Sequence, residues 1–179
     1  MSFPRRRESI RMKIIKPTIG ISQCLTDCFV RYDAKSQFNS DLINTLEQHF
    51  KLVPVCPEVE CGMGVPRPPI QLVETEQGIR VIGRDDKQLD VTDKLNNYSN
   101  TKVQSLYNLS GYVFKTRSPS CGVNSTPVFS LQGEITKFAN GVFVNALQKH
   151  YPQMPVIDDA EFADKTKLEQ FILQAKEVS

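Results

Sequence analysis

The sequence predicts an α/β fold, namely a three-layer, Rossmann-like domain with a mainly parallel sheet and one β-hairpin excursion. Short runs rich in β-branched residues alternate with stretches whose apolar residues recur at helical spacing. Between the strand-like runs 17–22 and 51–55, Leu42, Leu46 and Phe50 share one helix face. A strand, a helix and a second strand in this order imply a right-handed parallel crossover. Repetition of this rhythm favours helices on both faces of the sheet.

The first half of the chain gives clear signals for where its elements begin and end. The first strand is expected from Pro17 to Ser22 and the second from Lys51 to Val55. The helix between them begins after Asn39, because an asparagine side chain accepts a hydrogen bond from the first helical turn. Residues 57–69 hold four prolines and two glycines, so we expect an ordered loop there rather than a helix.

The hairpin excursion is expected where residues 70–73 and 79–82 flank a turn at Gln77-Gly78. The rest of the chain returns to alternating helices and strands. The expected elements are a helix capped by Thr92 that runs to Leu109 with a break around Ser99-Asn100, a strand from Gly111 to Lys115, a helix near 139–150, a short strand at Pro155-Val156-Ile157 and a helix over 161–176.

Length and composition favour one globular domain over residues 13–179. The chain has 179 residues, of which 40% are hydrophobic, enough to fill a single core. Residues 1–12 hold four arginines without the apolar stretch of a secretory signal, and we interpret them as a disordered leader or start-site overhang. A net charge of +2 gives no strong basic field for nucleic acid.

Two further observations concern the compartment. No run approaches the roughly 18 apolar residues that a membrane helix needs, so we expect no membrane partner. The five cysteines are an odd number in a chain without a signal peptide, which indicates a reducing, cytoplasmic environment with free or metal-bound thiols.

Three cysteines follow strand-like runs and open turns. Cys24 follows the first strand, Cys56 follows the second, and Cys121 lies shortly after the strand at 111–115. Ligands gather at the carboxyl ends of strands in open α/β sheets, so these thiols are expected to converge on one point. The expected site is a metal or cluster centre, or a thiol nucleophile with neighbouring groups; the alternative is that each cysteine packs as a small apolar residue.

The kind of metal follows from the ligands that are present. The chain has only two histidines, both late in predicted helices, so soft thiolates favour an iron–sulfur cluster or zinc. Cys28 and Cys61 form no tight CxxC pair with their neighbours. Three thiolates on a four-iron cluster leave one iron open to substrate. Four thiolates leave no open iron and favour a structural or electron-transfer role.

Polar residues beside the cysteines are candidates for catalysis. Glu58, two residues after Cys56 and behind the rigid Pro57, is a candidate general acid or base, with a solvated loop carboxylate as the alternative. Ser118 and Ser120 flank a proline before the third cysteine. Either hydroxyl can hold a polar substrate edge, and turn capping is the alternative.

Charged residues in the first two loops are candidates for substrate binding. Arg31 and Asp33 follow the first cysteine, and Arg67 lies in the proline-rich segment. A buried arginine–carboxylate scaffold is the alternative interpretation for these residues.

Three separated motifs in this order are similar to a known family. They are Ile21-Ser22-Gln23-Cys24-Leu25 with Val30-Arg31-Tyr32-Asp33, then Pro54-Val55-Cys56-Pro57-Glu58-Val59 with Gly62-Met63-Gly64-Val65-Pro66-Arg67, and finally Lys115-Thr116-Arg117-Ser118-Pro119-Ser120-Cys121-Gly122. From about Lys16 to Ala163 the chain resembles the thiouracil desulfidase (TudS-like) family, long catalogued as a domain of unknown function.

The resemblance implies a [4Fe-4S] cluster held by Cys24, Cys56 and Cys121, which aerobic preparation can remove or replace. Glu58 matches the catalytic carboxylate of the family. The catalytic serine falls in the Ser-Pro-Ser-Cys block, where Ser118 is favoured and Ser120 is not excluded. The implied reaction is hydrolytic and non-redox: substrate sulfur binds the open iron, water attacks the carbon, and an oxo-pyrimidine and sulfide form.

The resemblance implies a small thiolated nucleobase, of the 2- or 4-thiouracil type, as substrate. The segment from Tyr151 to Ala163 resembles the junction in the long, two-domain form of the family, whose added domain is linked to thiolated tRNA. Because the chain ends at Ser179, tRNA is possible but not favoured, and the oligomeric state stays open. The rival interpretation is a non-catalytic zinc or thiol module, or an RNA-associated remnant, against which Glu58 and the near-neutral charge argue.

Overall fold

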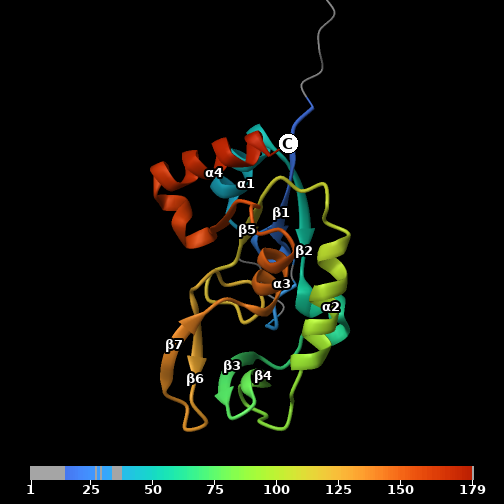
Figure 1. Ribbon diagram of the computed structural model, residues 1–179, viewed down its shortest axis with the longest axis vertical. Helices are drawn as coiled ribbons and strands as arrows, with labels where there is room; N and C mark the ends of the chain where they lie inside the picture. Colours follow the sequence, from blue (N-terminus) through green and yellow to red (C-terminus); the bar gives the residue numbers. More distant parts are fainter. Residues whose placement is uncertain (1–14, 27, 29, 34–37, 179) are drawn as a thin grey trace, which may run out of the picture.

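The computed structural model describes residues 15–26, 28, 30–33 and 38–178, which form two four-stranded sheets (Figure 1). The predicted leader at residues 1–12 lies outside the described residues. The first sheet is parallel and has the strand order β2-β1-β5-β8. Its strands are β1 (Thr18–Ser22), β2 (Lys51–Val55), β5 (Tyr112–Phe114) and β8 (Val156–Asp158).

The first β-α-β unit has the predicted arrangement. Helix α1 (Ser40–His49) begins after Asn39, whose side chain accepts a hydrogen bond of 3.0 Å from the Leu42 N–H. β1 and β2 then pair in parallel along their whole length, with Ser22 opposite Val55. The carboxyl ends of these two strands therefore lie side by side.

Helices cover both faces of the parallel sheet, which confirms the predicted three-layer α/β class. α1 and α4 (Lys165–Glu177) pack on one face and appear together at the top of Figure 1. α2 (Thr92–Gln104) and α3 (Val142–His150) pack on the other face. Strand alternation divides the core, because Val113 packs toward α1 and α4 while the residues on either side of it pack toward α2 and α3.

The predicted hairpin is part of a second sheet at the opposite end of the molecule from α1 and α4 (Figure 1). β3 (Ile70–Thr75) and β4 (Gly78–Gly83) pair antiparallel as predicted. β6 (Thr126–Phe129) adds parallel to β3, and β7 (Ile135–Ala139) adds antiparallel to β6. This sheet buries a small core of its own: Leu72, Val81, Val91, Leu95 and Val128.

The prediction of a non-helical loop over residues 57–69 is wrong for its first half. Residues 57–63 form a helical turn that includes η2 (Val59–Met63), and the Glu60 N–H donates to the Cys56 carbonyl at 2.9 Å. Pro57 is compatible with this turn because a first helical residue needs no N–H. Gly62, with a φ of +88°, then breaks the helical path.

The predicted role of Thr92 as a helix cap is also wrong. Thr92 is the first residue of α2, and its N–H donates to Asp90 Oδ1 at 2.9 Å. Its hydroxyl instead accepts the Val81 N–H at 2.8 Å and so ties the helix to β4. α2 runs without a break through Ser99-Asn100, and it ends at Gln104 rather than Leu109.

Two later helices begin after their predicted starts. The helix expected near 139–150 begins at Val142, because Ile135–Ala139 form β7. The helix expected over 161–176 begins at Lys165, after the 3-10 helix η3 (Asp159–Ala163). In the described part of the chain, no helix is both long and apolar enough to cross a membrane.

Candidate active site

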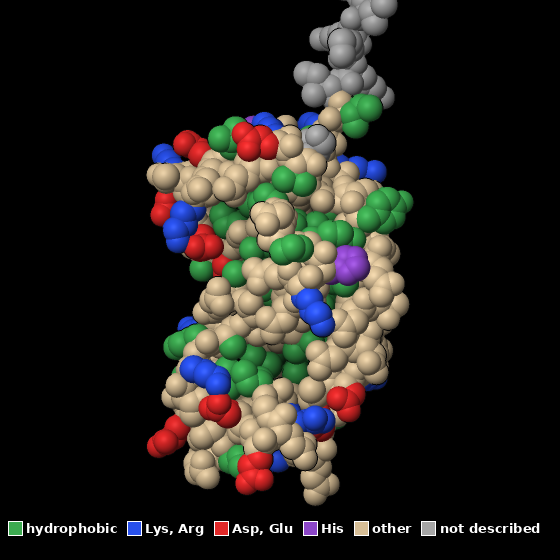
Figure 2. All heavy atoms as spheres, viewed as in Figure 1, with side chains coloured by type: hydrophobic (Ala, Val, Ile, Leu, Met, Phe, Trp, Pro, Cys, Tyr) green, Lys and Arg blue, Asp and Glu red, His purple; other side chains and the backbone are tan. Residues whose placement is uncertain are grey.

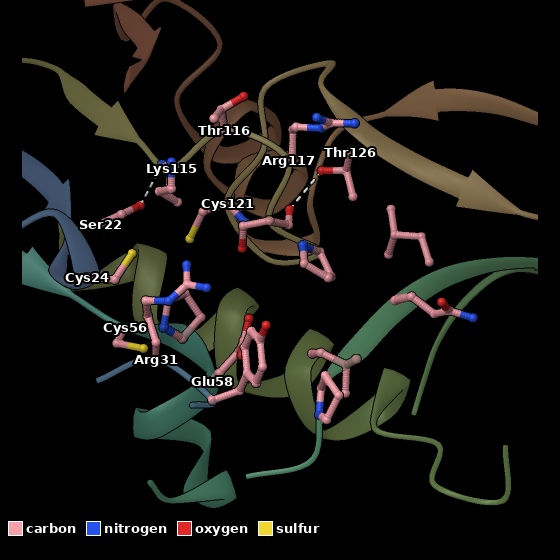
Figure 3. A pocket seen from close by; sticks show the side chains of 18 of the residues that line it. Ser22, Cys24, Arg31, Cys56, Glu58, Lys115, Thr116, Arg117, Cys121 and Thr126 are labelled. Carbon is pink, nitrogen blue, oxygen red and sulfur yellow. Dashed lines mark hydrogen bonds between the residues drawn. The ribbon is translucent and has the colours of Figure 1, made fainter. Parts of the chain in front are cut away.

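Three loops carry the predicted cysteines to one edge of the parallel sheet. Cys24 lies in the short 3-10 helix η1 (Gln23–Leu25) after β1, and Cys56 directly follows β2. Cys121 lies in the loop that follows β5, the other neighbour of β1. All three line a single cavity, as Figure 3 shows. The structure thus brings together the three thiols that the sequence singles out.

The cavity has a volume of about 350 Å³, within the range of roughly 300–1,000 Å³ for small-molecule sites. Apolar side chains from both sheets form much of its wall, and polar side chains come from the loops. The apolar lining includes Val30, Val55, Ile70, Leu72 and Phe129, and the polar lining includes Arg31, Glu58, Arg67, Lys115, Arg117 and Ser118. Such a mixture suits a flat heterocycle with polar edges.

Cys28 and Cys61 lie apart from the three cavity cysteines. Neither lines the cavity, and the Cys61 thiol donates to the Glu58 carbonyl at 3.3 Å. Neither thiol therefore shares the cavity with Cys24, Cys56 and Cys121.

The protein environment alone favours protonated thiols at the cavity. Burial, and after it the negative charge of Cys56, raises the pKa of Cys24 to about 12. Burial also raises the pKa of Cys56 and, against a hydrogen bond from Ser22, raises that of Cys121 well above its usual value. A thiolate is the form that binds metal, so a bound cation would have to supply the stabilising positive charge.

Among the described residues, no three or more His, Cys, Asp or Glu side chains lie close enough together to hold a single metal ion. The three cavity thiols instead surround a shared space (Figure 3).

Glu58 is held at the cavity wall by two other segments of the chain. Its Oε2 accepts a hydrogen bond of 2.8 Å from the Arg67 Nε and forms an ion pair of 2.8 Å with the Arg67 Nη2. Its Oε1 accepts a hydrogen bond of 2.8 Å from the Ser120 hydroxyl. The carboxyl side chain is only 12% exposed, so these contacts fix its orientation toward the cavity.

Arg67 has the scaffold role that the sequence left as an alternative. Its Nη1 donates to the carbonyls of Val30 and Gly64 at 2.8 and 3.0 Å, and its side chain is 4% exposed. These contacts and the pair with Glu58 tie the first loop to the second. Arg67 therefore positions Glu58 as well as lining the cavity.

Arg31 lines the cavity, whereas Asp33 does not. The two side chains form an ion pair of 3.2 Å, and the Arg31 guanidinium lies 5.3 Å from the centre of the Tyr32 ring. Of the predicted substrate-binding pair, only Arg31 is placed to meet a molecule in the cavity.

The two candidate serines have different surroundings. Ser118 lines the cavity, and its hydroxyl oxygen accepts the N–H groups of Ser120 and Cys121 at 3.3 and 3.2 Å. Ser120 is 1% exposed and does not line the cavity, since its hydroxyl is turned toward Glu58.

The sequence interpretation missed two charged residues of the site. Lys115 follows β5 directly, lines the cavity and pairs with Asp159 at 2.7 Å; its position at a strand end was the available signal. Glu60 accepts the Cys56 N–H at 3.1 Å. Burial opposes ionisation of Glu60, but hydrogen bonds from Lys102, Tyr98 and Cys56 prevail and lower its pKa.

Comparison with known proteins agrees with the geometry. A family model described as 2-thiouracil desulfurase matches residues 19–159. A solved structure of TudS, described as a [4Fe-4S]-dependent thiouracil desulfidase, is 23% identical, with a TM-score of 0.66 over 87% of this chain and 99% of that one. This likeness is one of fold, and no curated protein matches significantly. Because the family model covers most of the chain, the protein belongs to the 2-thiouracil desulfurase family and is a desulfidase enzyme.

Proposed function

We propose that the protein removes sulfur from a thiolated pyrimidine with a [4Fe-4S] cluster held by Cys24, Cys56 and Cys121. The observation that carries this proposal is the meeting of three thiols from three strand ends around one cavity, with Glu58 fixed at its wall. The family supports the desulfidase class, and the fold relative TudS is described as [4Fe-4S]-dependent.

The residues present fit a sulfur-rich cofactor. Three cysteines line the cavity, thiolates are soft ligands, and neither histidine of the chain lines it. The Tyr112 hydroxyl is fully buried and has no hydrogen-bond partner among the described residues. Burial, and then the negative charge of Cys121, raises the pKa of Tyr112.

When bound, such a cluster supplies an iron without a protein ligand that can accept the substrate sulfur. The chain's own residues supply the remaining chemistry. Glu58 takes a proton from the water whose oxygen bonds to the pyrimidine carbon as the C–S bond breaks. The products are the oxo-pyrimidine and sulfide, so water is consumed and no electrons are exchanged.

Arg67 and Ser120 keep the Glu58 carboxylate facing the cavity. Ser118 is placed to donate its O–H to a polar edge of the pyrimidine, because that hydroxyl has no acceptor among the described residues. The apolar wall from Leu72 and Phe129 covers the ring and limits the entry of water.

A free thiobase suits this site better than tRNA. The net charge is only +2, and on the face shown in Figure 2 acidic and basic side chains are interspersed rather than segregated. A strong, contiguous basic surface, which binding to the phosphate backbone requires, is not seen on that face.

Anaerobic reconstitution with iron and sulfide, followed by assay of sulfide release from 2-thiouracil, tests the proposal. We expect a brown protein with about four irons per chain, and a Glu58→Gln variant that keeps its iron but loses roughly 100-fold or more in kcat, the usual contribution of a general base. Glu74→Gln is the matched control, because Glu74 is an ion-paired carboxylate on β3 that does not line the cavity. A Glu58→Gln enzyme with full iron and full activity would exclude the acid–base role, and stoichiometric zinc in place of iron would exclude the cluster.

A further inference from the structure

Helix α2 presents three side chains to the helical turn that follows Cys56. Lys94, Tyr98 and Lys102 are spaced four residues apart and therefore lie on one face of the helix. The Lys94 Nζ donates to the Gly62 carbonyl at 3.1 Å. The other two donate to the same oxygen of Glu60, the Tyr98 hydroxyl at 2.6 Å and the Lys102 Nζ at 2.8 Å.

The second oxygen of Glu60 joins this cluster of contacts to the thiol site. Glu60 Oε1 accepts the backbone N–H of Cys56 at 3.1 Å, while Oε2 is held by Tyr98 and Lys102. The Glu60 side chain is 31% exposed and that of Lys102 is 27% exposed, so the pair is partly shielded from water. One carboxylate thus links α2 directly to the backbone of a cavity cysteine.

We propose that Glu60 is a positioning residue that fixes Cys56 for cofactor binding, and that α2 holds Glu60 in place through Tyr98 and Lys102. This inference rests on the proposed function for its cofactor, although the contact with Cys56 is independent of it. A fixed N–H keeps the thiol oriented into the cavity. The same contact keeps the Cys56 N–H from donating to the sulfur atoms of a bound cluster. The Glu60 carboxylate also places a negative charge near those sulfur atoms.

The orientation of the Cys56 thiol and the charge near the sulfur atoms both have measurable consequences in the protein with its cluster bound. Groups that orient a metal ligand from outside typically contribute about 10–100-fold to metal retention. The reduction potential of an iron–sulfur cluster depends on nearby charge and on hydrogen bonds to its sulfurs. Loss of the Glu60 carboxylate should therefore speed loss of iron and raise the reduction potential.

The first experiment uses the protein without any cofactor. Hydrogen exchange of the Cys56 amide, followed by NMR, should be at least about tenfold faster in Glu60→Ala than in the unaltered protein, because the N–H loses a charged acceptor. Glu74→Ala is the control, since Glu74 also accepts from a lysine and a threonine, Lys137 and Thr136, but does not line the cavity. Unchanged exchange at Cys56 in Glu60→Ala would overturn the proposal.

The second experiment uses the reconstituted protein under anaerobic conditions. Glu60→Ala should lose iron to a chelator about 10–100-fold faster, and its reduction potential should shift upward. Tyr98→Phe and Lys102→Met, which leave Glu60 in place, should speed the loss of iron to a smaller degree. Lys102→Met removes a positive charge, so it should not raise the reduction potential. Lys137→Met, which breaks the control pair, should change neither quantity.

The reduction potential of the bound cluster distinguishes a positioning role of Glu60 from a general contribution of Glu60 to protein stability. A merely structural role would lower the melting temperature of Glu60→Ala and leave the potential of the folded, loaded fraction unchanged, which would contradict the proposal. If the unaltered protein takes up no cluster, the proposed function fails, whereas the amide-exchange comparison still decides whether Glu60 controls Cys56.

Discussion

Ser118 and Ser120 lie two residues apart in the loop before Cys121, yet their hydroxyls serve different neighbours. The Ser118 oxygen accepts two backbone N–H groups, which leaves its own proton free to point into the cavity. The Ser120 proton is already given to Glu58. We therefore predict that Ser118 contacts the substrate and that Ser120 acts through the carboxylate.

This division predicts different kinetic effects for the two alanine variants. Ser118→Ala should lower kcat/KM for 2-thiouracil by about 10–100-fold, since it removes a hydrogen bond to the substrate in a buried site. Ser120→Ala should lower kcat while leaving KM nearly unchanged, because it loosens Glu58 without touching the substrate. Steady-state kinetics at equal iron content makes the comparison. The assignment is wrong if Ser120→Ala raises KM and Ser118→Ala does not.

The sequence could not decide between these serines. Both flank Pro119 in a loop, where neither the period of a strand nor that of a helix sets the direction of a side chain. The deciding contact is with Glu58, which is remote in the sequence. The cysteines were easier to predict, because each follows a strand whose carboxyl end must lie at the same edge of a parallel sheet.

At the scale of elements, α3 shapes the loop that carries Cys121. The first N–H groups of the helix donate to that loop, Val142 to the Pro119 carbonyl at 3.0 Å and Phe143 to the Ser120 carbonyl at 2.9 Å. Gly141 permits this approach, because a Cβ there would lie 2.3 Å from the Ser120 carbonyl carbon. The N–H groups at the start of α3, which have no acceptor within the helix, thus donate to carbonyls of the loop that carries Cys121.

Gly141→Ala should therefore push the Cys121 loop away from the other two thiols. We expect a destabilisation of about 1–3 kcal/mol from overpacking, together with faster loss of iron from the reconstituted protein. Gly133→Ala is the control: Gly133 has a φ of +91° and open space around it, so alanine there adds strain in the β6–β7 turn at a residue that does not line the cavity. Denaturant unfolding and iron release measure the two effects, and equal iron loss in both variants would refute the link.

The two sheets differ in how far the sequence could predict them. The β3–β4 hairpin was predicted because two runs rich in β-branched residues flank a Gln-Gly turn. The β6–β7 pair was missed because Pro127 argues against a central strand and β7 is almost fully exposed. The structure accommodates Pro127 because β6 pairs with β3 only at the two residues after it.

At the scale of the whole molecule, the cavity is the point where the two sheets meet. The parallel sheet supplies the thiols from the carboxyl ends of three adjacent strands, with β1 between β2 and β5. The second sheet supplies part of the apolar wall through Ile70, Leu72 and Phe129. A group bound to all three thiols would tie together segments that are far apart in the chain and would bind only the folded state.

Cofactor loading should consequently stabilise the whole molecule. A ligand present at a hundredfold excess over its Kd, and bound by the native state alone, adds about 2.7 kcal/mol to the free energy of unfolding. We expect anaerobic reconstitution to raise the denaturant midpoint, and Cys24→Ser or Cys121→Ser to abolish that rise. Cys28→Ser is the matched control, because Cys28 lies close to Cys24 in the sequence but does not line the cavity. If Cys28→Ser abolishes the rise in the denaturant midpoint while Cys24→Ser preserves it, the ligand assignment is wrong. The stabilisation should disappear only when a thiol at one of the three strand ends is removed, because those thiols join distant segments of the chain through the bound group.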